Sequence, residues 1–164
     1  MTFDQYLAAY ALGKVRSSDL PDLGVQALTE GYDSVDLAVL AGSTSRSASP
    51  RELEELFFGG LRQLDKVIPS RAEAGRVLRD YYASLVATGA MSPRTGGAEL
   101  VKLIDELGGE FPSQEYVGDG LGLARIYGLY DSYDDVKDGD DQSHREIDDE
   151  IKKACEELLD QRSV

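Results

Sequence analysis

Apolar residues recur at intervals of three and four along most of the chain, which is the spacing of one face of an α-helix. The last segment shows this most clearly, with apolar positions at Ile147, Ile151, Ala154, Cys155, Leu158 and Leu159. No segment alternates apolar and polar residues in the way of a half-buried strand. The pattern predicts helices over residues 3–15, 20–30, 34–41, 50–65, 71–88, 93–107, 115–130 and 144–161.

Residues that favour helix ends stand at the same boundaries. Four pairs have the capping-box spacing, in which a hydroxyl and a Glu or Gln three residues later satisfy each other's backbone amides. These pairs are Thr2 with Gln5, Ser49 with Glu52, Ser70 with Glu73, and Ser143 with Glu146. Pro50 and Pro93 each follow a serine, at the first helical position that proline prefers. Glycine, which favours the position after a helix, follows the predicted segments at Gly31, Gly42, Gly89 and Gly108.

These elements predict an all-α fold. A chain of 164 residues is long enough to bury a core without disulfides. We expect one helical domain over residues 1–164, an irregular bundle of about eight short helices or a set of stacked helical hairpins. Gly59 and Gly60 interrupt an otherwise good helix, and we interpret them as a place where two helices approach closely or one helix kinks.

Charge is concentrated at the C-terminal end. Residues 131–164 carry 13 acidic and 5 basic side chains and supply −8 of the net charge of −14. We expect an acidic loop over residues 131–143 that leads into the helix at 144–161. So negative a chain is repelled by nucleic acid and by anionic membranes, and it favours a basic protein as its partner.

Tyrosine and aspartate alternate just before and within this loop. Tyrosine beside carboxylates is suited to burial against a cationic surface, because the ring packs while the hydroxyl stays hydrogen-bonded. We therefore predict a partner-binding face composed of Tyr127, Tyr130, Asp131, Tyr133, Asp134, Asp135, Asp138, Asp140 and Asp141. The alternative is that the tyrosine rings cover the core and expose only their hydroxyl ends.

Other chemistry finds little support in the spacing of residues. A calcium loop starting at Asp134 would place Val136 and Arg145 at ligand positions, so the segment fits that motif poorly. His144 is the only histidine, and Cys155 lies on an apolar helix face, where we expect an inert buried thiol. We assign no catalytic residue, no metal ligand and no cofactor.

Four segments together resemble a group of small, acidic, helical bacterial proteins of uncharacterised role. The segments are Leu20–Gly31, Leu37–Gly42, Pro50–Phe57 and Gly89–Ala98. The chain is also similar, in charge, size and helicity, to acidic immunity proteins that neutralise bacterial toxins. That second resemblance implies an inhibitor role and supplies no catalytic residue.

The hypothesis that follows is a non-enzymatic protein-binding module, immunity-like, that engages a basic partner through the acidic and tyrosine face. The alternative is a small-ligand-binding or enzymatic helical domain that uses scattered carboxylates and arginines. It would require a well-formed pocket and a carboxylate with a strongly shifted pKa. The first residues lack the pattern of a signal peptide, and no apolar run is long enough to span a bilayer, so we expect a cytoplasmic protein.

Overall fold

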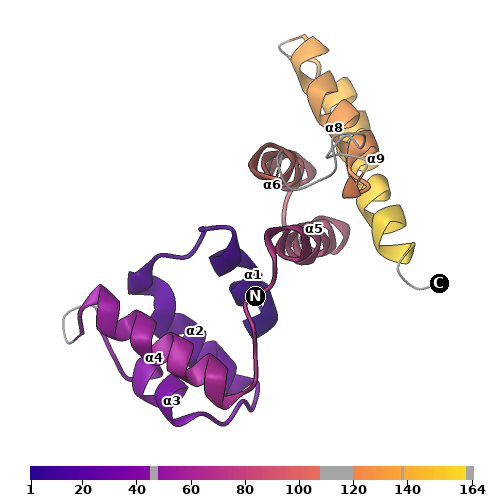
Figure 1. The fold of residues 1–164 in the computed structure, drawn as a ribbon. Helices are drawn as coiled ribbons and strands as arrows, with labels where there is room; N and C mark the ends of the chain where they lie inside the picture. Colours follow the sequence, from indigo (N-terminus) through magenta and orange to yellow (C-terminus); the bar gives the residue numbers. More distant parts are fainter. Residues whose placement is uncertain (45–47, 108–119, 138, 162–164) are drawn as a thin grey trace. The chain divides into compact units, whose positions relative to one another are not determined.

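The computed structural model describes residues 1–44, 48–107, 120–137 and 139–161. Within these ranges the chain forms α-helices and two 3₁₀ helices, and no strand. The prediction of an all-α, multi-helix fold is therefore confirmed (Figure 1). The chain divides into two compact units, residues 1–74 and 75–164, and the boundary falls inside a helix. The expected single domain stays a prediction.

The helix boundaries follow the local signals of the sequence. The helices are α1 (Phe3–Ala11), η1 (Ser17–Asp19), α2 (Leu20–Thr29), α3 (Val35–Ala41), α4 (Pro50–Gln63), α5 (Arg71–Ala87), α6 (Pro93–Glu106), α8 (Ala124–Asp131), η2 (Ser132–Asp135) and α9 (Asp141–Asp160). Capping boxes form at Thr2, Ser49 and Ser70, as predicted. Pro50 and Pro93 occupy the first positions of their helices. Of the expected helix at 115–130, residues 115–119 lie outside the described residues, as does Gly108.

The first unit packs α1 to α4 around one hydrophobic core. Its fully or almost fully buried members are Phe3, Leu7, Leu20, Leu23, Ala27, Leu37, Leu40, Leu53, Phe57 and Leu61. The Tyr10 ring packs on Phe57 with ring centroids 4.9 Å apart, so α1 and α4 meet through aromatic side chains. Lys66, just after α4, lies over the rings of Phe3 and Tyr32 and pairs with Asp4.

Two glycine positions set how closely helices approach in this unit. A Cβ at Gly24 would lie 2.8 Å from the backbone nitrogen of Ala41 and 2.9 Å from the backbone oxygen of Leu37, so α2 and α3 touch backbone to backbone. A Cβ at Gly60 would lie 2.4 Å from Cγ of Leu37. The interpretation of Gly59-Gly60 as a site of close helix approach is therefore confirmed, because a side chain at Gly60 would force Leu37 to shift.

A small polar network joins α3 to the end of α4. The buried Ser34 caps α3 by accepting from the Leu37 amide at 3.2 Å, and its hydroxyl donates to Oε1 of Gln63 at 2.7 Å. The same Gln63 oxygen accepts from the Asp36 amide at 3.3 Å. Because every buried polar atom here has a partner, the junction carries no desolvation penalty from an unpaired group.

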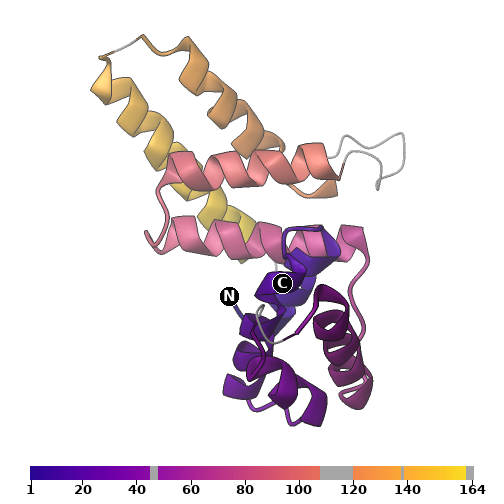
Figure 2. The ribbon, with the colours of Figure 1, turned by 90° about the vertical axis from the view of Figure 1, so that its left-hand side faces the viewer.

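The second unit contains two antiparallel helix pairs. At one end of the first pair a Cβ on Gly75 of α5 would meet Leu107, and at the other end a Cβ on Gly96 of α6 would meet Val86. Helices α8 and α9 form the second pair and lie side by side (Figure 2). The buried side chains of this unit are Leu78, Ala83, Val86, Leu100, Leu103, Ile104, Leu107, Leu121, Leu123, Ile126, Tyr133, Ile151, Ala154, Cys155 and Leu158.

Candidate functional site

The acidic segment lies where α8 ends and α9 begins. Asp131 is the last residue of α8, Asp134 and Asp135 belong to η2, and Asp140 is the N-cap of α9. The expected loop over 131–143 is therefore largely helical, and α9 begins at Asp141, three residues before the predicted start. Asp138, also assigned to the partner-binding face, lies outside the described residues.

The cap of α9 differs from the prediction. Asp140, rather than Ser143, caps the helix: its Oδ1 accepts from the Ser143 amide at 3.1 Å and its Oδ2 from the Ser143 hydroxyl at 2.7 Å. These hydrogen bonds, the one from the hydroxyl first, lower the pKa of Asp140. The predicted pair of Ser143 with Glu146 was wrong because a better acceptor, a carboxylate, stands three residues before Ser143.

The three tyrosines do not share one exposed face. Tyr127 is exposed and Tyr130 is half-buried, whereas Tyr133 is only 6% exposed and belongs to the core. The Tyr133 hydroxyl donates to Oδ1 of Asp148 on α9. The inclusion of Tyr133 in an exposed docking face is therefore corrected: for this residue the alternative, a ring that covers the core, is the observed arrangement.

Tyr133 is held from three sides. The Tyr130 ring meets it edge-on with centroids 5.7 Å apart, and the guanidinium of Arg94 at the start of α6 lies 5.1 Å from its ring centre. Burial, followed by the hydrogen bond to Asp148 and the charge of that carboxylate, raises the pKa of Tyr133. The residue therefore joins η2 to both α6 and α9, and it fixes the backbone that carries Asp134 and Asp135.

Removal of the Tyr133 hydroxyl tests this role. We expect Tyr133→Phe to lower the free energy of unfolding by about 1–2 kcal/mol, since a hydrogen bond to a carboxylate is lost. A tyrosine pKa raised in the folded state stabilises the fold below the unfolded value of about 10, and that contribution disappears as the pH rises above it. As the pH rises from neutral to strongly alkaline, the free energy of unfolding should therefore fall less for Tyr133→Phe than for the wild type, because the variant has no Tyr133 hydroxyl to ionise.

Urea unfolding at a series of pH values measures both effects. Tyr130→Phe is the matched control, because the Tyr130 hydroxyl makes no hydrogen bond within the described part of the chain. Equal stability of Tyr133→Phe and the wild type at neutral pH would show that the bond to Asp148 contributes nothing.

The exposed carboxylates of this region have no ion-pair partner among the described residues. Asp131, Asp134 and Asp135 are exposed and make no ion pair or side-chain hydrogen bond with other described residues. The guanidinium of Arg94 lies over the Tyr133 ring. Arg145 donates instead to the backbone oxygen of Asp141 at 3.1 Å. Among the described residues, no ion pair or side-chain hydrogen bond therefore offsets the charge of Asp131, Asp134 or Asp135.

Further along α9 the acidic side chains are partly neutralised. Arg125 of α8 pairs with Glu150 at 2.8 Å and also with Glu157, seven residues later on α9. The sequence pattern did not predict that Arg125 joins α8 to α9 or that Asp148 accepts a hydrogen bond from Tyr133. The seven-residue spacing of Glu150 and Glu157 places them on one helix face, but it does not show which arginine meets them.

The metal interpretation gains no geometric support. No group of three or more His, Cys, Asp or Glu side chains that could hold an ion occurs among the described residues. Val136, at the third position of the considered calcium loop, ends η2 in an extended conformation. Cys155 is buried, and burial raises the pKa of its thiol to about 11, so the thiol is protonated at neutral pH.

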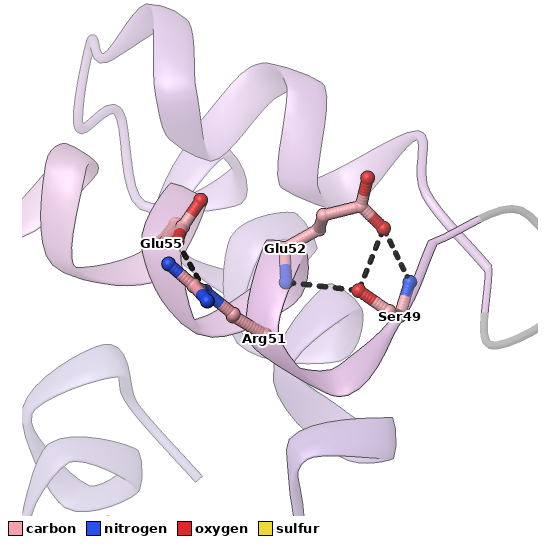
Figure 3. A network of polar contacts seen from close by, with 4 residues as sticks. All are labelled: Ser49, Arg51, Glu52 and Glu55. Atoms are coloured by element: carbon pink, nitrogen blue, oxygen red, sulfur yellow. Dashed lines mark hydrogen bonds and ion pairs between the residues drawn. The ribbon is translucent and has the colours of Figure 1, made fainter.

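The enzymatic or ligand-binding alternative requires a pocket, and the first unit has a surface hollow that could be considered for this role. It has a volume of about 380 Å³ and is lined by Ala48, Glu52, Glu55 and Leu56. Both carboxylates already have partners (Figure 3): Glu52 accepts from the amide and hydroxyl of Ser49, and Glu55 pairs with Arg51 at 2.8 Å. Hydrogen bonds from Ser49 lower the pKa of Glu52. This shift arises from helix capping, and it makes the carboxylate a weaker base rather than a better catalyst.

The described residues form an all-α protein in two compact units, with exposed carboxylates at one helix junction. The chain matches no protein family, no curated protein and no solved structure. In the described residues no helix combines the length and the apolar character needed to cross a bilayer.

Proposed function

We propose that the chain is a protein-binding module that engages a basic partner through its acidic junction, defined as the exposed surface of Asp131, Asp134, Asp135 and Asp141. The observation that carries the proposal is that these carboxylates are exposed on η2 or on the helix ends that flank it, and that the Tyr133 of η2 is held by Asp148 and Arg94. Charges carried on a fixed backbone require little further ordering of the chain when a partner binds. They also steer a basic surface toward the site.

The finer form of the proposal is an immunity-like inhibitor that neutralises a basic protein. Supporting this role are the net charge of −14, the small size and the all-helical fold. An inhibitor gains from fast association, and long-range attraction between opposite charges raises association rates at low salt. The proposed site of action of this binding module is the cytoplasm.

Charge reversal at the acidic junction is the direct test. We expect the variant Asp131→Lys/Asp134→Lys/Asp135→Lys to lose capture of its partner from a lysate of the source cells at low salt. Asp140 stays unchanged, because its carboxylate caps α9 and its loss would cost about 1 kcal/mol of stability. Raised salt should weaken capture by the wild type, since exposed charges are screened.

A control variant with the same change in net charge separates local from overall charge. Asp105→Lys/Glu156→Lys/Asp160→Lys alters exposed carboxylates on α6 and on the far end of α9, about 20 Å along the helix from Asp141. It should retain most of the binding. Equal loss of binding in both variants would contradict the proposal, because net charge alone would then govern capture. Far-UV circular dichroism must show the same helical signal for all chains.

A further inference from the structure

A second surface, on the first unit, combines exposed apolar side chains with exposed acidic side chains. Helices α2 and α3 form a hairpin held by the backbone contact at Gly24. On its outer side four aliphatic residues are exposed, at Val25 (50%), Leu28 (39%), Val35 (71%) and Val39 (52%). Val25 and Leu28 are three residues apart and Val35 and Val39 are four apart, so each pair lies on one face of its helix.

The two pairs belong to the same side of the hairpin. On α2 the buried residues Leu20, Leu23 and Ala27 point to the core while Gly24 meets α3. Leu28, four residues after Gly24, therefore lies next to the α2–α3 contact and away from the core. On α3 the face that holds Leu37 and Leu40 is buried, which leaves Val35 and Val39 on the outer side. We name this set of four residues the hairpin face.

The hairpin segment itself carries charge of one sign, and Lys66, which lies over the Tyr32 ring, pairs with Asp4 of α1. Residues 17–45 contain five carboxylates and no lysine or arginine. Glu30 and Asp19 are used within the fold, because they accept from the backbone amides of Phe3 and Arg16. Asp22 and Asp33 are exposed and make no side-chain bond with the described residues. Asp22 stands three residues before Val25, so a negative charge adjoins the apolar surface.

We propose that the hairpin face binds an amphipathic, basic helix of a partner protein. Its aliphatic residues would cover the exposed valines, and its lysines or arginines would lie against Asp22 and Asp33. Charge complementarity selects this occupant, since a second copy of the chain would bring the same negative charges together. An anionic lipid surface would be repelled for the same reason. The inference does not depend on the acidic junction, which lies in the other unit.

A model peptide provides the test. The probe is a fluorescent helical peptide with leucines at positions i, i+3, i+4 and i+7 and lysines elsewhere, titrated and followed by anisotropy. The protein carries Asp131→Lys/Asp134→Lys/Asp135→Lys throughout, so that the acidic junction does not capture the probe. Failure of the hairpin proposal and failure of the proposed function are then separate outcomes.

We expect Val35→Gln/Val39→Gln to weaken binding on the order of tenfold, since about 1.4 kcal/mol of apolar burial is lost. Glutamine keeps the helix propensity, so the seven-residue α3 should persist. The matched control is Val67→Gln, which alters an 82% exposed valine of the same unit outside the hairpin. It should leave the affinity unchanged. Asp22→Asn/Asp33→Asn should reduce the salt dependence of binding.

Three results would overturn the proposal. The first is equal binding of a scrambled peptide of the same composition, because an apolar helix face would then be irrelevant. The second is equal binding of a peptide with glutamate in place of lysine. The third is a dimer in sedimentation experiments that Val35→Gln/Val39→Gln abolishes, because the hairpin face would then bind a second copy.

Discussion

Phe57→Ala should lower the free energy of unfolding by about 3–5 kcal/mol, the typical loss for a large buried aromatic side chain. Phe57 is fully buried in the core of the first unit, where its ring contacts both Tyr10 and Phe58. Truncation leaves a cavity that helices α1 and α4 cannot close without moving the whole interface. This loss is a large fraction of the free energy of unfolding of a typical domain.

The neighbouring residue provides a matched control. Phe58 is 37% exposed, so Phe58→Ala removes the same atoms from a partly solvated position and should cost much less. Chemical denaturation followed by circular dichroism measures the difference, and amide hydrogen exchange locates it. We expect faster exchange to be concentrated in residues 1–74, where the contacts of Phe57 lie. Similar losses for Phe57→Ala and Phe58→Ala would contradict the described core.

Gly24→Ala should lower the free energy of unfolding by about 1–3 kcal/mol, although alanine favours a helix more than glycine does. The added methyl would lie within 3 Å of backbone atoms of Leu37 and Ala41, and a backbone cannot move aside as a flexible side chain does. Helices α2 and α3 would have to separate, which would expose Leu23 and Leu37. The effect therefore opposes the usual direction of a glycine-to-alanine change in a helix.

Gly42→Ala is the control for this substitution. Gly42 ends α3 with φ of −82°, and a Cβ there would meet the nearest atom at an ordinary 3.6 Å. We expect a change near zero. Thermal unfolding compares the stability of Gly24→Ala with that of Gly42→Ala. A Gly24→Ala variant more stable than the wild type would show that the backbone contact of α2 with α3 is looser than described.

Local signals in the sequence predicted the helices well. The residues Ser49, Pro50 and Glu52 stabilise the first turn of the helix in which they lie, so the start of α4 can be predicted without the rest of the fold. The periodicity of apolar residues likewise identified the buried face of α9. These properties belong to single helices, and that is why the sequence alone was sufficient.

Features that depend on contacts between two helices could not be predicted from the sequence. Gly24 looks like any glycine within a helix, and only the approach of α3 shows its role. The spacing of Tyr127, Tyr130 and Tyr133 predicts a shared face, but the chain turns into η2 after Asp131 and Tyr133 enters the core. The boundary between the two compact units, at residue 74, falls within the continuous helix α5, so no proline-rich or glycine-rich linker marks it in the sequence.

The buried thiol has a practical consequence for kinetic measurements. Cys155 is the only cysteine of the chain, and it lies in the core on α9 with a thiol that ionises near pH 11. A thiol reagent can react only when α9 opens and the sulfur meets solvent. The labelling rate then equals the open fraction multiplied by the rate of a free thiol, so the natural chain reports the opening of its second unit without an introduced probe.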